Sequence, residues 1–85
     1  MAYRVELSAA ARRELRGLDS NARDRILRAL LRFETDPRPA GAKKLTGRDE
    51  LWRVRAGDYR IVYEVRDKLL VVLVVRVAHR REAYR

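Results

Sequence analysis

The stretch that decides the fold covers residues 51–66 and reads LWRVRAGDYRIVYEVR. On both sides of Gly57-Asp58, apolar and charged residues alternate with the two-residue period of a half-buried β-strand. Gly57-Asp58 is a signal for a tight hairpin turn, although a weaker one than Asp-Gly. The stretch therefore predicts two antiparallel strands, residues 52–56 and 59–66, joined by a short turn.

Downstream, Asp67-Lys68 marks a second tight turn, and residues 69–78 are a nearly continuous run of Leu and Val. Such a run predicts a central strand that is covered on much of both faces. The polar segment 79–85 that follows is expected to form one helical turn. Residues 51–78 therefore predict three consecutive antiparallel strands.

The N-terminal half carries a strand and two helices. Residues 3–7 alternate apolar and charged side chains, and Ser8 is a typical N-cap for the short helix that follows. A second helix is predicted for residues 22–33, and Asp36-Pro37 ends it because proline cannot continue the hydrogen-bond ladder. The polar residues 40–50 are expected to form a loop.

The resulting order is β-α-α-β-β-β, which predicts an α+β fold: an antiparallel sheet with a helical hairpin packed on one face. The first strand has to pair too, because a lone strand leaves its backbone groups unsatisfied. The two-residue period of the strands and the helical period of the two helices also predict which side chains meet in the core. These are Trp52, Tyr59, Ile61, Tyr63, Val75 and Val77 on the sheet, and Leu15, Leu18, Ile26, Leu30 and Phe33 on the helices.

Charge is the most unusual property of the chain. Its 85 residues include 21 Lys or Arg against 12 Asp or Glu, a formal net charge of +9, and 18 of the basic residues are Arg. An excess of one sign attracts polyanions, and Arg binds phosphate through two parallel hydrogen bonds. An Arg-rich genome would explain the ratio of Arg to Lys, but not the net charge. The composition therefore favours a nucleic-acid partner for a single domain, residues 1–85.

The composition also argues against several chemistries. Because the chain has no Cys, it has no disulfide, thiolate metal site or cysteine nucleophile, and with one His we expect no metal site. No apolar run reaches the roughly 18 residues of a membrane span. The first residues also lack an apolar signal segment. We therefore expect a cytoplasmic protein without a cofactor and without a membrane partner.

Strand parity sorts the charged residues of the predicted sheet. If the aromatic residues face the helices, the other face carries five arginines: Arg53, Arg55, Arg60, Arg76 and Arg80. A solvated strand face is the alternative interpretation, but such faces mix both signs of charge. Glu64 is the only acid among the strand residues assigned to a face. The pattern therefore favours a basic surface for a phosphodiester backbone.

Four segments, in chain order, carry a resemblance: Lys44-Leu45-Thr46-Gly47, residues 51–55, GDYRIVYEV at 57–65 and VAHRREAY at 77–84. With the length and the element order, they resemble RelE-type toxins of the RelE/ParE toxin–antitoxin superfamily. The resemblance implies the RelE-like microbial RNase fold and a ribosome-dependent endoribonuclease, or mRNA interferase. Such a toxin cleaves mRNA in the ribosomal A site through the ribose 2′-hydroxyl, without a metal, and is neutralised by a cognate antitoxin, expected here to be acidic.

The resemblance also implies roles for single residues. Arg60 matches the arginine that holds the scissile phosphate, Arg80 the arginine near the leaving group, and Tyr84 the tyrosine that orients the substrate nucleotide. Arg53 and Arg55 stand where well-studied members carry two lysines. These five residues form the candidate catalytic set, and the candidate RNA-binding residues are Lys43, Lys44, Arg48, Arg76 and Arg81.

Arg53 and Arg55 do not identify the general base of the reaction, because Arg in effect cannot lose its proton. His79 has the most suitable ordinary pKa and is a candidate acid or base, but strand parity points it away from the arginines. The pKa of Tyr84 would have to be lowered by neighbouring cations. Glu64 is more typical of a structural partner for an arginine. Electrostatic stabilisation without any strong base is the remaining alternative.

Two other functions stay open at this point. ParE-type toxins share the fold and act on DNA gyrase by protein contact, and a relative that has lost catalysis could keep its affinity for RNA or antitoxin. Leu27 and Leu31 lie beside the apolar stripe of the second helix, where they either widen the core or contact another protein.

Overall fold

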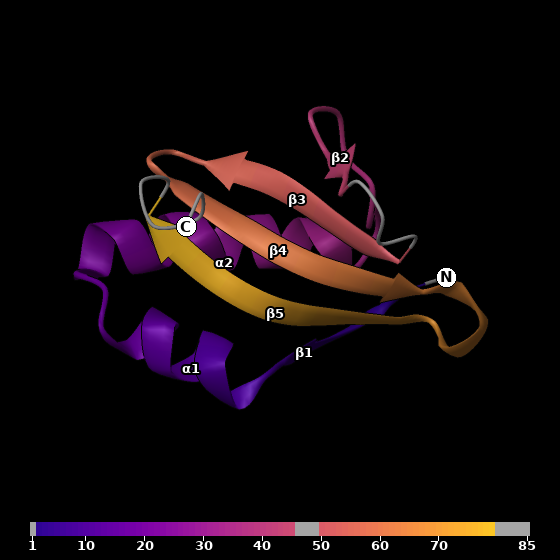
Figure 1. The fold of residues 1–85 in the computed structure, drawn as a ribbon, viewed down its shortest axis with the longest axis horizontal. Coiled ribbons are helices and arrows are strands. Elements are labelled where there is room, and N and C mark those ends of the chain that lie inside the picture. The colour runs from indigo at the N-terminus through magenta and orange to yellow at the C-terminus, as the bar shows by residue number, and fades with distance from the viewer. Residues whose placement is uncertain (1, 46–49, 80–85) are drawn as a thin grey trace.

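The computed structural model describes residues 2–45 and 50–79. Its five-stranded sheet has the order β1-β5-β4-β3-β2, and α2 lies behind the sheet in the view of Figure 1. The strands are β1 (Arg4–Leu7), β2 (Lys43–Lys44), β3 (Leu51–Ala56), β4 (Tyr59–Arg66) and β5 (Val71–His79), and the helices are α1 (Ala9–Arg16) and α2 (Ser20–Phe33). The predicted α+β fold is therefore confirmed.

The predicted hairpin is formed by β3 and β4, with Arg55 opposite Arg60 across the two strands. Gly57 in its turn has a φ of +63°, a left-handed conformation that glycine adopts without strain. A Cβ atom at Gly57 would lie 2.4 Å from Nη1 of Arg25 on α2. Glycine therefore allows the turn and leaves room for the side chain of Arg25 beside it.

The sheet differs from the prediction in two respects. Lys43 and Lys44, expected in a loop, form the short edge strand β2, which pairs antiparallel with Arg53 and Trp52. Two exposed lysines give no periodicity from which such a strand could be predicted. In addition, β1 pairs parallel with β5, so that the sheet is mixed. Parallel pairing requires a long crossover connection, which the chain from α1 to β4 supplies.

Both helices begin at side-chain caps, and the cap at Ser8 was expected from the sequence. The Ala11 N–H donates to Ser8 Oγ over 3.0 Å, and the Ala22 N–H donates to Asp19 Oδ1 over 2.8 Å. No helix in the described part of the chain is long and apolar enough to span a membrane.

The core lies between α2 and one face of the sheet, which we call the helix face. The Phe33 ring of α2 packs against the Tyr63 ring of β4, with 4.3 Å between ring centroids. Most of the predicted core residues are buried: Ile26, Leu30, Phe33, Ile61, Tyr63 and Val77. Four others, Trp52, Tyr59, Leu15 and Leu18, are half-buried at the rim of the same cluster.

Val75 is the predicted core residue that the structure places differently. Val62 pairs with Arg76 and Tyr63 pairs with Val74, so Val75 has no opposite residue and forms a β-bulge. The bulge reverses the parity of β5, and Val74 rather than Val75 is fully buried. The continuous run of Val and Leu hid this extra residue, because it shows no alternation that would reveal the register.

Candidate functional site

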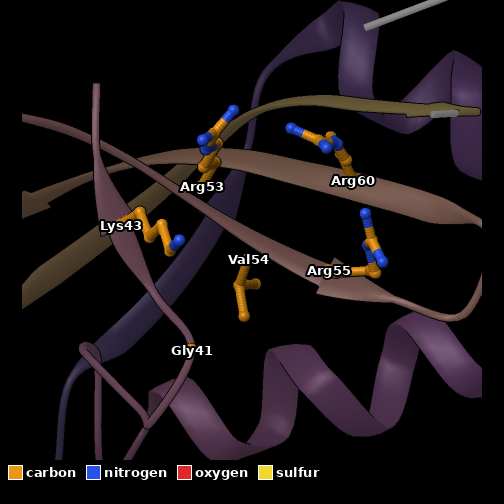
Figure 2. Close-up of a pocket in the computed structure, with 6 residues that line it drawn as sticks. All are labelled: Gly41, Lys43, Arg53, Val54, Arg55 and Arg60. Carbon is orange, nitrogen blue, oxygen red and sulfur yellow. The ribbon is translucent and has the colours of Figure 1, made fainter. Parts of the chain in front are cut away.

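A basic cavity of about 310 Å³ opens at the edge of β3. Its lining residues are Gly41, Lys43, Arg53, Val54, Arg55 and Arg60. Figure 2 shows Arg53 and Arg60 on the side of the sheet away from α2, which we call the arginine face, and Lys43 reaching toward the cavity from β2. The structure therefore brings together three of the candidate catalytic residues and one candidate RNA-binding residue.

Three strands position these side chains. Arg55 lies directly opposite Arg60, and Lys43 lies directly opposite Arg53, so that all four residues belong to the same face of the sheet. Before β2, Gly41 has a left-handed φ of +93°. Because β2 pairs with β3 only at Trp52 and Arg53, no strand within residues 2–45 and 50–79 covers the edge of β3 from Val54 onward.

The cavity concentrates positive charge. No acidic side chain is among its lining residues in the described part of the chain. Like charges directly opposite each other on a sheet repel, and an anion between them removes that repulsion. Arg60 is itself buried, with 9% of its surface exposed, and burial strengthens its interaction with a charged ligand. The arrangement is suited to a phosphate group.

Arg76, which was predicted to contact RNA, forms an ion pair with Glu14 of α1. Its Nε and Nη2 atoms lie 2.8 and 2.7 Å from Oε2 of Glu14. The same carboxylate accepts the Val77 N–H through Oε1 over 2.8 Å. Sequence reasoning did not single out Glu14, although it is the only acid of α1 in a stretch rich in arginine.

The remaining described candidates lie away from the cavity. Lys44 is opposite Trp52, which places it on the helix face. His79 also belongs to the helix face, as parity predicted, and its ring meets the Tyr59 ring edge-on at 5.4 Å. It lines a second cavity of about 280 Å³ together with Asp19, Arg25 and other residues near the start of α2. The structure therefore does not bring His79 to the basic cavity with Arg53, Arg55 and Arg60.

The last candidates either have a structural partner or lie outside the described residues. Glu64 forms an ion pair with Arg66, the structural role that the sequence favoured. Arg48, Arg80, Arg81 and Tyr84 lie outside the described residues. Residues 2–45 and 50–79 contain no group of three or more His, Cys, Asp or Glu side chains that could hold a metal ion.

Comparison with known proteins gives three concordant results. Residues 5–84 match the family described as the ParE toxin of the type II toxin–antitoxin system parDE. The mRNA interferase toxin RelE of Escherichia coli is 33% identical over 85 residues, which cover 98% of this chain and 88% of that protein. Among solved structures, the archaeal RelE–RelB complex from Pyrococcus horikoshii has a TM-score of 0.84 at 30% identity, covering 94% of this chain and 97% of the other.

A further match is the intact RelBE toxin–antitoxin complex of Escherichia coli, with a TM-score of 0.79, 32% identity and coverage of 92% and 96%. The fold and the basic cavity thus define the class, and the chain belongs to the RelE/ParE superfamily of type II toxins. Within that superfamily it is of the RelE type, because the matched relatives and structures carry that name.

Proposed function

We propose that this protein is a ribosome-dependent endoribonuclease that cleaves mRNA in the ribosomal A site and thereby stops translation. The observation that carries the proposal is the convergence of Lys43, Arg53, Arg55 and Arg60 on one cavity. A phosphodiester entering this cavity meets cations from three strands and no carboxylate among the described lining residues. The likeness to an mRNA interferase at 33% identity supports the same reaction. Such a function would place the protein in the cytoplasm.

The proposed reaction is an attack of the ribose 2′-oxygen on the neighbouring phosphorus. The bond from phosphorus to the 5′-oxygen breaks, which leaves a 2′,3′-cyclic phosphate on one product and a 5′-hydroxyl on the other. Negative charge builds up on the phosphoryl oxygens in the transition state, and Arg60 is placed to bind them with Arg53 and Arg55 beside it. Arg80 and Tyr84 join this set by family resemblance alone.

Two protons must move in this reaction, and arginine transfers neither. Among the described lining residues, Lys43 is the one side chain that can donate a proton to the leaving 5′-oxygen. The Tyr84 hydroxyl is the remaining family candidate for taking the proton from the 2′-hydroxyl. His79 has no part in this proposal, because it belongs to the opposite face of the sheet.

A cognate antitoxin is the second proposed partner, since this chain matches RelE in complexes with RelB. Leu27 and Leu31 of α2 are 40% and 63% exposed, and Arg28 and Arg32 lie beside them. An amphipathic helix with acidic flanks would cover these leucines and pair with the arginines. We propose that α2 docks the antitoxin and that the resulting bulk keeps the toxin out of the A site.

Primer extension in a translating extract tests the main proposal. Cuts in an mRNA that appear only with the protein, and only within translated sequence, are expected. Products ending in a 2′,3′-cyclic phosphate would match the proposed attack. An mRNA left intact while DNA gyrase is inhibited would instead establish the ParE-type function, and an intact mRNA with retained RNA binding would establish a toxin that has lost catalysis.

A further inference from the structure

The outer edge of β5 has two different neighbours. β1 pairs with the first half of β5, as far as Leu7 opposite Val74, and α1 runs beside the second half (Figure 1). The change from strand to helix occurs at Ser8, the N-cap of α1, and it coincides with the bulge at Val75. The backbone groups along the second half therefore need partners other than a strand.

Ser8 and Glu14 supply these partners. The Ser8 N–H donates to the Val74 carbonyl over 2.9 Å, and Ser8 Oγ donates to the Val75 carbonyl over 2.8 Å. Glu14 accepts the Val77 N–H over 2.8 Å through one carboxylate oxygen and binds Arg76 through the other. We call Ser8, Glu14 and the residues 74–77 that they hold the β5 clasp. It spans the bulge from one side to the other.

The bulge determines to which face of the sheet each side chain at the end of β5 belongs. Without it, the pairing of Tyr63 with Val74 would continue as Ile61 with Arg76. Val77 would then leave the core for the arginine face. With the bulge, Ile61 pairs with Val77 and Arg60 pairs with Ala78. The register at Arg60 therefore depends on one extra residue in β5.

We propose that Ser8 and Glu14 are positioning residues for the basic cavity, because they hold the bulge that sets the register between β5 and the strand carrying Arg60. This inference rests on the proposed function for its catalytic part only. Neither residue is among those lining the cavity, so each acts through β5. Bulges commonly redirect side chains next to functional sites, and here the bulge held by Ser8 and Glu14 determines the direction of the β5 side chains beside the basic cavity.

The two residues can be tested without removing the helix cap. Ser8→Asp keeps the cap, since Asp19 caps α2 in the same way, but an ionised carboxylate cannot donate to the Val75 carbonyl. Ser8→Thr restores a hydroxyl donor. Glu14→Ala removes both contacts of Glu14, whereas Glu14→Gln keeps an acceptor for the Val77 N–H. Glu6→Ala is the matched control, because Glu6 is exposed on β1 and pairs with Arg4 over 2.9 Å, outside the clasp.

The experiment combines two measurements on each variant, purified from its antitoxin complex. NMR records the cross-strand contact between Ile61 and Val77, and single-turnover cleavage on programmed ribosomes gives the rate at saturation and the half-saturating concentration. Ser8→Asp and Glu14→Ala are expected to weaken the contact and to lower the saturating rate by about 100-fold, the usual cost of a misplaced catalytic group. The half-saturating concentration should not change, and Ser8→Thr, Glu14→Gln and Glu6→Ala should match the wild type.

If Ser8→Asp or a folded Glu14→Ala changes one measurement without the other, or neither, the proposal is overturned. If Glu14→Ala does not fold, Ser8→Asp alone carries the test, because it keeps the cap. A wild-type protein that cleaves no RNA contradicts the proposed function, and the NMR contact then still tests whether the clasp sets the register.

Discussion

Two regions of the molecule use arginine in opposite ways. In the basic cavity, cations face cations across neighbouring strands. At the other end of the sheet, Arg38 donates to both carboxylate oxygens of Asp67 over 3.2 and 2.7 Å, and its guanidinium carbon lies 5.3 Å from the centroid of the Trp52 ring. Asp67 also accepts a hydrogen bond from the Tyr3 hydroxyl over 2.7 Å.

The difference between the regions lies in the acids, not in the arginines. Hydrogen bonds from Arg38 and Tyr3 lower the pKa of Asp67 to about 2, so that this carboxylate stays charged and holds Arg38 in place. Among the described residues that line the basic cavity there is no acidic side chain. In a chain with 18 arginines, the distribution of carboxylates therefore marks the site better than the number of basic residues does.

Replacing one arginine in each region should give the largest contrast. Arg60→Ala is expected to lower the single-turnover cleavage rate by about 100- to 1000-fold, the usual cost of losing one group that stabilises transition-state charge. Arg38→Ala should leave the rate unchanged, because its partners lie at the other end of the sheet. Circular dichroism checks that both variants fold. Equal cleavage rates for the two variants would refute the assignment of the cavity.

The two neighbouring lysines of β2 sharpen the comparison within a single strand. Lys43→Arg keeps the charge but not the ability to donate a proton, and we expect it to slow cleavage by about 100-fold. Lys44→Arg should cleave like the wild type, because Lys44 is opposite Trp52 on the helix face.

A substrate with sulfur in place of the leaving 5′-oxygen separates proton donation from binding, because a thiolate leaves without being protonated. The Lys43→Arg defect should largely disappear with this substrate. A defect of equal size on both substrates would assign Lys43 to RNA binding alone.

Ionic strength should distinguish the two regions by a smaller but measurable effect. RNA binding is expected to weaken steeply with salt, because each cation–phosphate contact releases counterions. Arg55→Ala should reduce the slope of log K against log salt by about 0.7, the value for one contact with a single strand. Arg38→Ala should keep the wild-type slope. Binding that does not depend on salt would instead favour recognition of a protein target.

Asp67→Asn tests the region around Arg38 through the stability of the fold, and it should have the smallest effect on function. The folded pKa of Asp67 is lowered from 3.8 to about 2, so its stabilisation is complete above about pH 4 and is lost as the pH falls through 2. The wild type should therefore melt at a higher temperature than the variant near neutral pH, and the two should converge in acid. A gap in Tm that persists at the lowest pH would contradict this account, and cleavage should not change.

The elements that the sequence predicted are those whose side chains alternate or cap. Apolar residues at every second position revealed β3 and β4, and Ser8 marked the start of α1. Arg53, Arg55 and Arg60 came together as predicted because strand parity and one tight turn determine their placement.

The features that escaped prediction depend on contacts between distant segments. β2 is two lysines that become a strand only because β3 is there to pair with them. The bulge at Val75 lies in a run of valines without alternation, and Glu14 meets Arg76 from 62 residues away. Lys43 was assigned to RNA, but its place beside Arg53 follows from the register of β2, which no local pattern encodes.

The order of the strands in the sheet affects how the protein folds during its synthesis. β5 is the last described strand in the chain, yet it lies between β1 and β4 in the sheet. β1 is synthesised first and has no strand partner until residues 71–74 have been made. Pairing across such a distance in sequence is slow compared with the formation of the β3–β4 hairpin. Until β5 has been made and has paired, the sheet lacks the strand that lies beside Arg60, so the site around this arginine is among the last parts of the described fold to form.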